Sequence, residues 1–378
     1  MTGRATASTR RGQPMRIELQ KRPVPSPLYA VLSPFIALGL TLVAGGIMFM
    51  ALGKNPFDAL YSFFIEPLTE VWSIHELTVK AAPLILIAVG LSVCYRSNNW
   101  NIGAEGQFIM GGILGSLVPI LMPGFQTWLT LPLMLVLGMI GGAAWGAIPA
   151  YLKTRFNTNE ILTSLMLVYT AQLFLDWLAR GVLRDPNGNN FPGSIRFPEA
   201  ARLPEIIPSQ GSAHYGLVIA ILAAIVIWFM LRFTLNGFEV RVLGANPRAG
   251  RFAGFSQTRM AFFAFLLSGG LAGLAGIAEV SGAIGQLRET ISPGYGFTAI
   301  IVAFLGRLNP LGAIAAGFML ALTYLGGEAA QMTLGISDKV GRVFQGLLLF
   351  FVLGCDTLIN YRVRLVWRKA TAPAGGKA

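Results

Sequence analysis

The chain has few charged residues. Only 12% of its 378 residues are Asp, Glu, Lys or Arg, and 54% are hydrophobic, whereas a soluble domain carries about 25% charged residues. Its mean hydropathy is +0.62. This composition excludes an ordinary soluble domain and indicates a membrane protein. The apolar runs are continuous rather than alternating, which favours membrane-spanning helices over a closed barrel.

The sequence also lacks the patterns of common catalytic sites. It contains no G-x-x-x-x-G-K-[ST] phosphate loop, so we expect no ATP hydrolysis by that route. It has no H-E-x-x-H motif and no nucleophile elbow. Its two cysteines form neither a disulfide framework nor a metal-ligand spacing. We therefore predict that the chain is not an enzyme and holds no cofactor or metal of its own.

The net charge of +12 comes largely from the two ends of the chain. Basic residues crowd 1–29 and 360–378, and the apolar segments lie between them. Basic segments beside apolar spans are typical of the cytoplasmic side of a membrane and attract anionic lipid headgroups. No basic and aromatic platform for nucleic acid is present. We predict two cytoplasmic tails, contact with the lipid bilayer and no nucleic-acid partner.

The segments between the tails predict an all-α polytopic membrane protein with a transmembrane domain at 30–359. An even number of spans places both termini in the cytoplasm, and most Lys and Arg then fall on that side. A loop rich in Pro, Gly and Asn is expected outside, at about 179–215, and a basic cytoplasmic loop at about 234–260. About ten spans are predicted, at 30–52, 77–95, 102–122, 129–152, 161–178, 216–233, 261–280, 294–305, 311–325 and 343–359.

Two apolar segments are short and interrupted by glycine. One contains NWNIGAEGQFIMGG (99–112) and the other SPGYGFTAIIVAFLGRLNP (292–310). They occupy the second place in spans 2–5 and in spans 7–10, two sets that cross the membrane in opposite directions. An inverted repeat is therefore possible, and broken helices at matching positions of such repeats indicate a transport site.

Polar residues gather at the start of the first broken segment, although polar groups at membrane depth are costly and usually face a cavity or a partner. One interpretation is that this segment lines a translocation pathway. The alternative is structural, with Glu105 capping a helix or pairing with Arg96. Under the first interpretation the pathway residues are Asn98, Asn101, Gly103, Glu105 and Gln107.

The basic loop contains the sequence GFEVRVLGANPRAGRFAGFSQTRM (237–260). Asn246 before Pro247 predicts a helix N-cap followed by proline at the first helical position, and Gly254 is suited to end the helix. Ala249 and Ala253 then share one face, which would allow close docking into a groove of another protein. The alternative is an ordinary basic cytoplasmic loop. Charged residues that could pair with an acidic partner are Arg248 and Arg251.

Four blocks of the sequence resemble one family. They are NIGAEGQ (101–107), TNEILTSLMLVY (158–169), GANPRAGRFAGF (244–255) and PGYGFTAIIVAFLGRLNPLG (293–312). Together they look like the permeases of ABC importers in the nucleoside and simple-sugar branch, which are related to ribose and branched-chain amino-acid permeases. The resemblance implies ATPase coupling through Gly244, Asn246, Ala249 and Gly254. It also implies a pathway near Asn101, Gly103, Glu105 and Gln107.

The same resemblance implies a set of partners. These are an ATPase subunit that binds ATP, a second permease subunit that is identical or homologous, and a periplasmic or lipoprotein solute-binding protein. The expected location is the bacterial inner membrane, with multiple passes. The chain would act as the permease subunit of an ATP-driven importer.

The chain departs from the family pattern at two places. Gly250 stands where alanine is more common, which would weaken the short helix by about 1 kcal/mol. Asn98 and Asn99 make the start of the first broken segment more polar than usual. A nucleoside or similar small polar solute is the leading prediction, with a simple sugar or a branched-chain amino acid as alternatives. A stand-alone secondary transporter or channel also fits the broken helices, but it leaves the short cytoplasmic helix unexplained.

Overall fold

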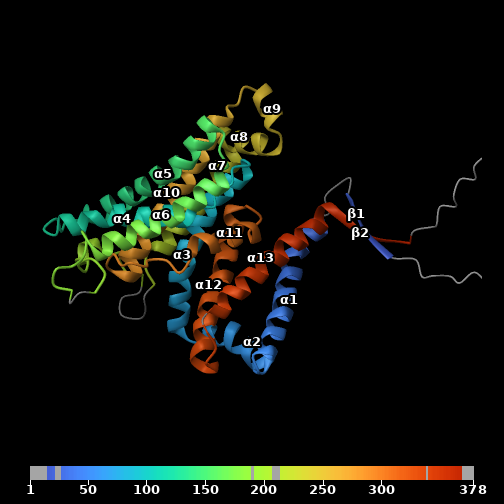
Figure 1. Cartoon of the computed structure of the whole chain (residues 1–378), viewed down its shortest axis with the longest axis horizontal. Coiled ribbons are helices and arrows are strands. Elements are labelled where there is room, and N and C mark those ends of the chain that lie inside the picture. The colour runs from blue at the N-terminus through green and yellow to red at the C-terminus, as the bar shows by residue number, and fades with distance from the viewer. Residues whose placement is uncertain (1–14, 22–26, 189–190, 207–212, 338, 368–378) are drawn as a thin grey trace, which may run out of the picture. The chain divides into compact units, whose positions relative to one another are not determined.

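The computed structural model describes residues 15–21, 27–188, 191–206, 213–337 and 339–367, and these residues are mostly helical (Figure 1). The all-α polytopic prediction is confirmed. The α-helices are α1 (Pro27–Ala51), α2 (Pro56–Phe64), α3 (Val71–Arg96), α4 (Ala104–Leu121), α5 (Thr130–Phe156), α6 (Glu160–Arg180), α7 (Gly216–Phe233), α8 (Leu235–Ala245), α9 (Pro247–Phe252), α10 (Gln257–Glu279), α11 (Tyr295–Leu305), α12 (Pro310–Leu334) and α13 (Lys339–Asn360). Short helical turns are η1 (Glu66–Leu68), η2 (Glu199–Ala201) and the π-helical η3 (Val280–Ile284).

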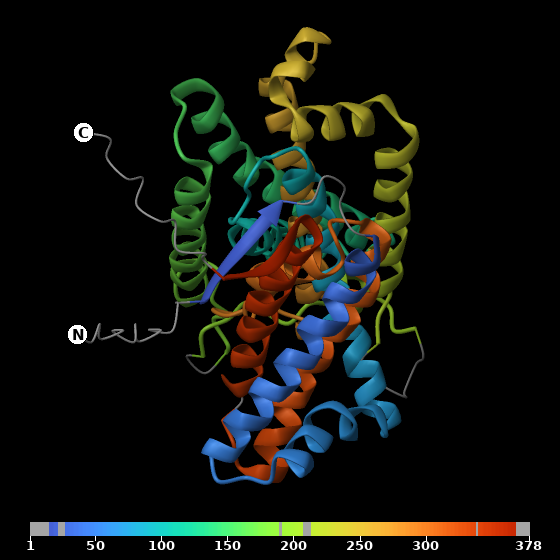
Figure 2. The same ribbon diagram turned by 90° about the vertical axis from the view of Figure 1, so that its right-hand side faces the viewer.

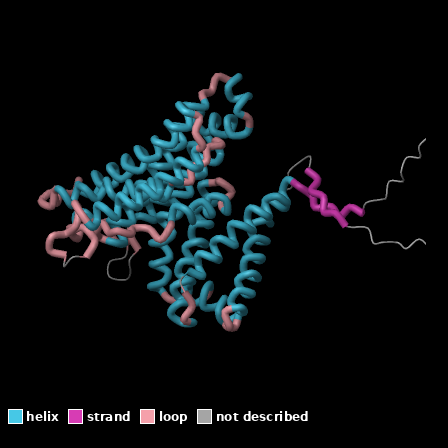
Figure 3. The backbone as a smooth tube through the Cα atoms, in the orientation of Figure 1, coloured by secondary structure: helices cyan, strands magenta, loops and turns pink. Residues whose placement is uncertain are grey.

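The chain divides into two compact units. The larger is Leu42–Leu349, and the smaller combines Met1–Thr41 with Phe350–Ala378. Within the smaller unit, strands β1 (Met15–Lys21) and β2 (Tyr361–Trp367) pair in antiparallel fashion, as Figure 3 shows. Each predicted basic tail thus contains a strand that the charge pattern did not indicate. The other tail residues, 1–14, 22–26 and 368–378, lie outside the described residues.

Each predicted span corresponds to one helix, but they differ in length. Eight helical runs in the described residues are long and apolar enough to cross a membrane: Leu32–Ala51, Val71–Arg96, Ala104–Leu121, Thr130–Phe156, Glu160–Arg180, Gly216–Phe233, Gln257–Ile284 and Pro310–Leu334. The predicted span 294–305 is α11, whose 11 residues extend about 16 Å, roughly half the hydrocarbon core of a bilayer. The tenth predicted span is α13. The inverted repeat stays a prediction.

Short helices occupy two connections that hydrophobic periodicity left unassigned. α2 lies between α1 and α3, where Asn55 Oδ1 accepts a hydrogen bond from the Phe57 amide at 3.1 Å. α8 precedes α9 in the basic loop, where Thr234 Oγ1 accepts from the Gly237 amide at 3.3 Å. Both helices begin at a capping side chain. They were missed because they lie outside the long apolar runs on which the prediction depended.

Close backbone packing holds α4, α5 and α10 together in the larger unit. A Cβ atom on Gly111 would lie 2.1 Å from the Cα of Gly273, and one on Gly142 would lie 2.1 Å from the carbonyl oxygen of Gly269. Small residues permit this approach in membranes, where van der Waals packing drives helix association. α3 contacts α7, α10, α11 and α12 and is buried along most of its length, so it is the central helix of this unit.

The two ends of the long helices carry different connections. At one end, α8 and α9 join α7 to α10 and project beyond the end of α10 (Figure 2). At the other end, the loop after α6 packs on the segment after η3: the Ser194 amide donates to the Leu287 carbonyl and the Phe197 amide to the Gly285 carbonyl, both at 2.8 Å. The predicted topology makes the first end cytoplasmic. Residues 189–190 and 207–212 of the predicted outer loop lie outside the described residues.

Candidate coupling and translocation sites

The short helix α9 begins at the predicted cap. Asn246 Oδ1 accepts hydrogen bonds from the backbone amides of Arg248, at 3.0 Å, and Ala249, at 3.2 Å. The helix ends at Phe252, and Gly254 adopts a φ of +85°, a left-handed conformation that glycine tolerates without strain. The local sequence therefore determines where this helix starts and stops.

The outer surface of α9 is open. Arg248, Ala249 and Arg251 are exposed, and the Phe252 side chain is 94% exposed. Aromatic and arginine side chains are enriched where proteins contact one another. Phe252 was not predicted, because the docking prediction rested on the small and charged residues of this loop. An isolated aromatic residue between Arg251 and Ala253 was the available signal.

Two glycines of this region face inward. A Cβ atom on Gly244 would lie 1.7 Å from the carbonyl oxygen of Arg96, and one on Gly250 would lie 2.4 Å from Leu243 Cδ2. Gly244 therefore packs α8 against the end of α3, and it is only partly exposed. Gly250 packs α9 closely on α8. Glycine at position 250 was expected to weaken α9, but it also permits a close contact with Leu243 that the methyl group of an alanine would obstruct.

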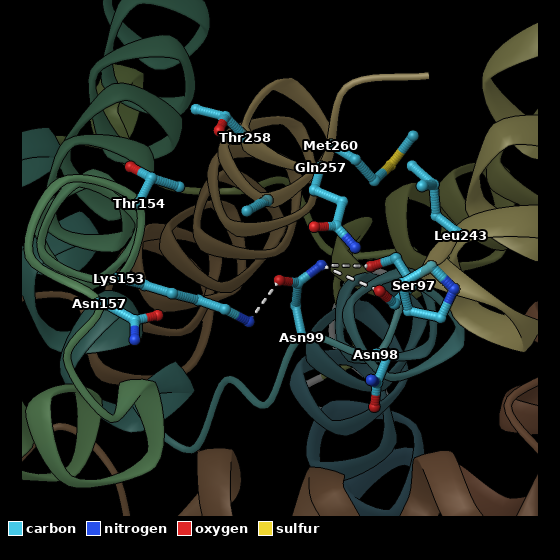
Figure 4. Close-up of a pocket in the computed structure, with 12 residues that line it drawn as sticks. Ser97, Asn98, Asn99, Lys153, Thr154, Asn157, Leu243, Gln257, Thr258 and Met260 are labelled. Atoms are coloured by element: carbon cyan, nitrogen blue, oxygen red, sulfur yellow. Dashed lines mark hydrogen bonds between the residues drawn. The ribbon is translucent and has the colours of Figure 1, made fainter. Parts of the chain in front are cut away.

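A polar cavity of about 290 Å³ lies behind α9, among the ends of α3, α5, α8 and α10 (Figure 4). Lys153 Nζ donates to Asn99 Oδ1 at 2.8 Å and to Glu160 Oε1 at 2.7 Å. Pro247, at the start of α9, and Gln257, at the start of α10, form part of the wall, so a displacement of α9 would alter this cavity. The full lining is Ser97, Asn98, Asn99, Lys153, Thr154, Asn157, Leu243, Pro247, Gln257, Thr258, Met260 and Ala261.

Asn98 is exposed at this cavity. It adopts a φ of +58°, a left-handed conformation in which asparagine is enriched, and it forms the turn between α3 and α4. Asn99, beside it, is buried and donates to Ser97 Oγ at 2.8 Å. The structure therefore places the first predicted pathway residue at the end of the unit that carries α9.

Asn101 and Gln107 are buried and bind each other. Asn101 Nδ2 donates to Gln107 Oε1 at 2.9 Å, and Gln107 Nε2 donates to Asn101 Oδ1 at 3.1 Å. Asn101 also donates to Ser268 Oγ on α10 at 3.1 Å and accepts from the Gly103 amide at 3.0 Å. Satisfied polar networks of this kind make a protein core rigid. The geometry favours the structural alternative for these two amides.

Glu105 connects the two broken segments. Its Oε2 accepts a hydrogen bond from the backbone amide of Gly296 at 2.5 Å, in the first turn of α11. Amides there have no partner within their own helix, and the helix dipole favours a negative charge. Glu105 thus caps a helix, as the structural alternative predicted, but its partner is α11 rather than Arg96. Gly103 packs against α6, since a Cβ atom added to it would lie 2.9 Å from the Ser164 carbonyl oxygen.

A second cavity, of about 400 Å³, lies along α11. Thr298 Oγ1 donates to Gln345 Oε1 at 3.0 Å and lies 2.8 Å from the Tyr324 hydroxyl, which therefore donates to it. Hydroxyl and amide groups from α11, α12 and α13 meet at this wall. The lining comprises Pro293, Gly294, Phe297, Thr298, Ile300, Ile301, Tyr324, Arg342, Gln345, Gly346 and Leu349.

The predicted pathway lies on the first broken segment and does not include this cavity. Thr298 lies in the second broken segment, 292–310, so the signal was present. Tyr324 and Gln345 carried no comparable signal. They lie in predicted spans, and a polar residue in a span shows its partners only once the helices are packed.

Comparison with known proteins assigns this architecture to a family. Residues 73–353 match the family model described as the permease component of the branched-chain amino acid transport system. The chain belongs to this permease family. It is 36% identical to the glucose ABC transporter permease protein TsgB13 of Haloferax volcanii, over 96% of this chain and 100% of that protein.

Two further relatives are named for nucleosides. The nucleoside ABC transporter permease protein NupB of Lactococcus lactis is 30% identical over 92% of this chain and 96% of its own length. The guanosine ABC transporter permease protein NupP of Bacillus subtilis is 29% identical over 90% of this chain and 96% of its own length. The predicted membership in the nucleoside and simple-sugar branch is confirmed. The chain is a multi-pass membrane permease of an ATP-driven importer.

Proposed function

We propose that this permease moves a nucleoside or a simple sugar into the cytoplasm, driven by ATP that a separate ATPase subunit binds and hydrolyses. It works with a second permease subunit, identical or homologous, in a bacterial inner membrane. A periplasmic or lipid-anchored binding protein delivers the solute. The relatives named for glucose, guanosine and nucleosides support this solute class.

The observation that carries the proposal is the exposure of α9. Phe252 is 94% exposed at the end of a short capped helix, with Arg248 and Arg251 exposed beside it. Such a ring would fill an apolar pocket on the ATPase, and the two arginines would pair with acidic side chains beside it. A stand-alone transporter or channel would gain nothing from such a surface, so the importer is the better reading.

Movement of α9 reaches the transmembrane helices through the polar cavity behind it. Pro247 lines this cavity together with Lys153 and Asn99, and Lys153 Nζ donates to Asn99 Oδ1 at 2.8 Å. Asn99 precedes α4, and Glu105 on α4 caps α11. A shift of α9 would thus act on this polar cavity, and α4 would carry it to α11.

The cavity along α11 is the proposed translocation site. Thr298, Tyr324 and Gln345 bind one another and Thr323, and the hydroxyls of a sugar or a ribose would bind here by donating to their remaining acceptor sites or by replacing these bonds. The Phe297 ring is 41% exposed and could pack on a sugar ring or a base. A free amino acid would need a carboxylate to bind its ammonium group, and the described lining residues of this cavity include no acidic side chain.

Copurification tests the coupling proposal. The permease is solubilised from native membranes in mild detergent as wild type, Phe252→Asp and Phe191→Asp. Phe191 is 76% exposed in the loop at the opposite end of the unit, so it is the matched control. We expect an ATPase to copurify with wild type and with Phe191→Asp. The amount of copurified ATPase should fall at least tenfold with Phe252→Asp. All three permeases should remain monodisperse.

Transport by reconstituted protein tests the alternative. In proteoliposomes that contain the complex, labelled nucleoside or sugar should accumulate on the side of the membrane that α9 faces. This accumulation should require ATP on that same side. If no ATPase copurifies and the permease alone moves solute, the stand-alone transporter replaces the importer. If an ATPase copurifies equally with Phe252→Asp, α9 is not the coupling surface.

A further inference from the structure

Three arginines converge at one corner of the larger unit. Arg96 ends α3, Arg232 lies in the last turn of α7, and Arg241 lies on α8. They line a cavity of about 260 Å³ that also includes Trp228, Leu231, Asn309 and Pro310. Within the part of the chain that the structure describes, no carboxylate lies at ion-pair distance from any of the three.

The contacts of these arginines fix their positions and leave their charges unbalanced. Arg241 donates to the Leu231 carbonyl oxygen. The Arg232 guanidinium carbon lies 5.6 Å from the centre of the Trp228 ring. Arg96, at the end of α3, is only partly exposed and lines the same cavity as Arg241. Arg232 and Arg241 are exposed and Arg96 is partly buried, and like charges around one cavity repel each other unless an anion joins them.

The shape of the guanidinium group limits which anion fits. Its planar, forked donors match the paired oxygens of a phosphate, and arginine is preferred wherever such recognition is needed. Three of them on three different helices can surround one phosphate group. The Asn309 side chain, also in the lining, adds a neutral donor.

The surroundings of the cavity indicate that the ligand also has an apolar part. α7 presents a continuous apolar surface that leads to the cavity, and Trp228 is the kind of residue that lies at a membrane–water interface. The predicted topology places this corner at the cytoplasmic leaflet, where anionic lipids attract basic residues. The exposed apolar residues of α7 are Val218 at 39%, Leu222 at 56%, Ile225 at 46%, Val226 at 61%, Phe229 at 56% and Phe233 at 61%.

We propose that Arg96, Arg232 and Arg241 bind the phosphate of an anionic phospholipid of the cytoplasmic leaflet, whose acyl chains lie along α7. The bound lipid joins the ends of α3, α7 and α8. Gly244 of α8 packs directly on the Arg96 carbonyl, so the lipid supports the base of the loop that carries α9. This site is separate from the cavity along α11 and does not depend on the solute.

The experiment compares lipid binding to the purified permease in a neutral detergent. Wild type, Arg232→Gln/Arg241→Gln and Arg248→Gln/Arg251→Gln are titrated with short-chain phosphatidylglycerol, with phosphatidylcholine and with inorganic phosphate. Binding is read by native mass spectrometry and by the shift in unfolding temperature. The second double variant removes the same charge from α9 and is the matched control.

We expect wild type and the α9 control to bind phosphatidylglycerol at least tenfold more tightly than phosphatidylcholine, and Arg232→Gln/Arg241→Gln to lose that preference. Arg232→Lys/Arg241→Lys, which keeps the charge but not the forked donors, should keep the preference for phosphatidylglycerol but bind it several-fold more weakly than wild type. Equal binding by all variants would overturn the proposal in favour of general charge attraction. Protection by inorganic phosphate alone would assign the cavity to a soluble anion, and loss of a copurified ATPase without loss of lipid would assign it to a protein partner.

Discussion

The Glu105 carboxylate caps α11 from the first turn of α4. Its Oε2 lies 2.5 Å from the backbone nitrogen of Gly296, a residue 191 positions later in the chain. The backbones of α4 and α11 are also in close contact here, since a Cβ atom added to Gly296 would lie 2.3 Å from the Glu105 nitrogen. One side chain thereby connects the two glycine-interrupted segments.

Replacing this carboxylate should destabilise the protein. Glu105→Ala leaves the buried Gly296 amide without an acceptor, which costs about 1–3 kcal/mol. Glu105→Gln keeps an oxygen acceptor, so it should lower the free energy of unfolding by less. The remaining cost is the replacement of a charge-assisted hydrogen bond by a neutral one. Unfolding of the two variants in detergent micelles measures both effects. A purely electrostatic contact would instead make the two variants equally unstable.

The glycine packing of α10 predicts a steric effect. A Cβ atom on Gly273 would lie 2.2 Å from the Gly138 carbonyl oxygen, whereas one on Gly39 of α1 would meet nothing within 4 Å. Gly273→Ala should reduce the yield of monodisperse protein several-fold because two backbones must separate. Gly39→Ala should be neutral or slightly stabilising, since alanine favours helix by about 1 kcal/mol. Size-exclusion chromatography after expression distinguishes them, and similar yields would show that α5 and α10 pack less closely.

Stability should fall in mild acid because of His214, which lies just before α7. Its Nδ1 accepts a hydrogen bond from the Gly216 amide at 3.1 Å, its Nε2 has no partner among the described residues, and burial lowers its pKa to about 4. In the unfolded chain the histidine pKa is about 6.5. Between these values only the unfolded state binds the proton, so this histidine reduces the free energy of unfolding as pH falls from about 6.5 to 4, by at most about 3 kcal/mol.

His214→Asn isolates this effect, because the asparagine oxygen can accept from the Gly216 amide and does not titrate. Thermal unfolding of both proteins in micelles between pH 4 and 8 provides the comparison. The wild-type curve should lose stability below about pH 6.5 more steeply than the variant and run parallel to it above about pH 7.5. Parallel curves over the whole range would mean that His214 is protonated in the folded protein.

Transport should depend on the polar wall of the cavity along α11. Thr298→Val removes the hydroxyl that binds Tyr324 and Gln345 at nearly constant volume, and we expect a tenfold or greater loss of solute uptake. Thr298→Ser keeps the hydroxyl and should retain most of it. ATPase copurification should be the same for both, because α9 is unchanged. Equal uptake by the two variants would move the pathway away from this wall.

Local patterns predicted much of the larger unit. Helix spans follow from continuous apolar runs, and the α9 cap follows from Asn246 before Pro247, because a cap depends only on the next few residues. The pathway prediction was less informative: Asn101 and Gln107 are polar at membrane depth, but a sequence does not show that they bind each other. The strands β1 and β2 were missed because pairing between distant segments leaves little trace in either one.

The sequence by itself determined that this chain spans a membrane, where its long helices lie, and where the short helix α9 begins. These features depend on hydropathy and on neighbours along the chain. The tertiary structure alone decided that Glu105 caps α11, that Thr298 meets Tyr324 and Gln345, and that Arg96, Arg232 and Arg241 share one cavity. Each of those contacts joins residues far apart in the chain, and only the packing of the helices brings them within bonding distance.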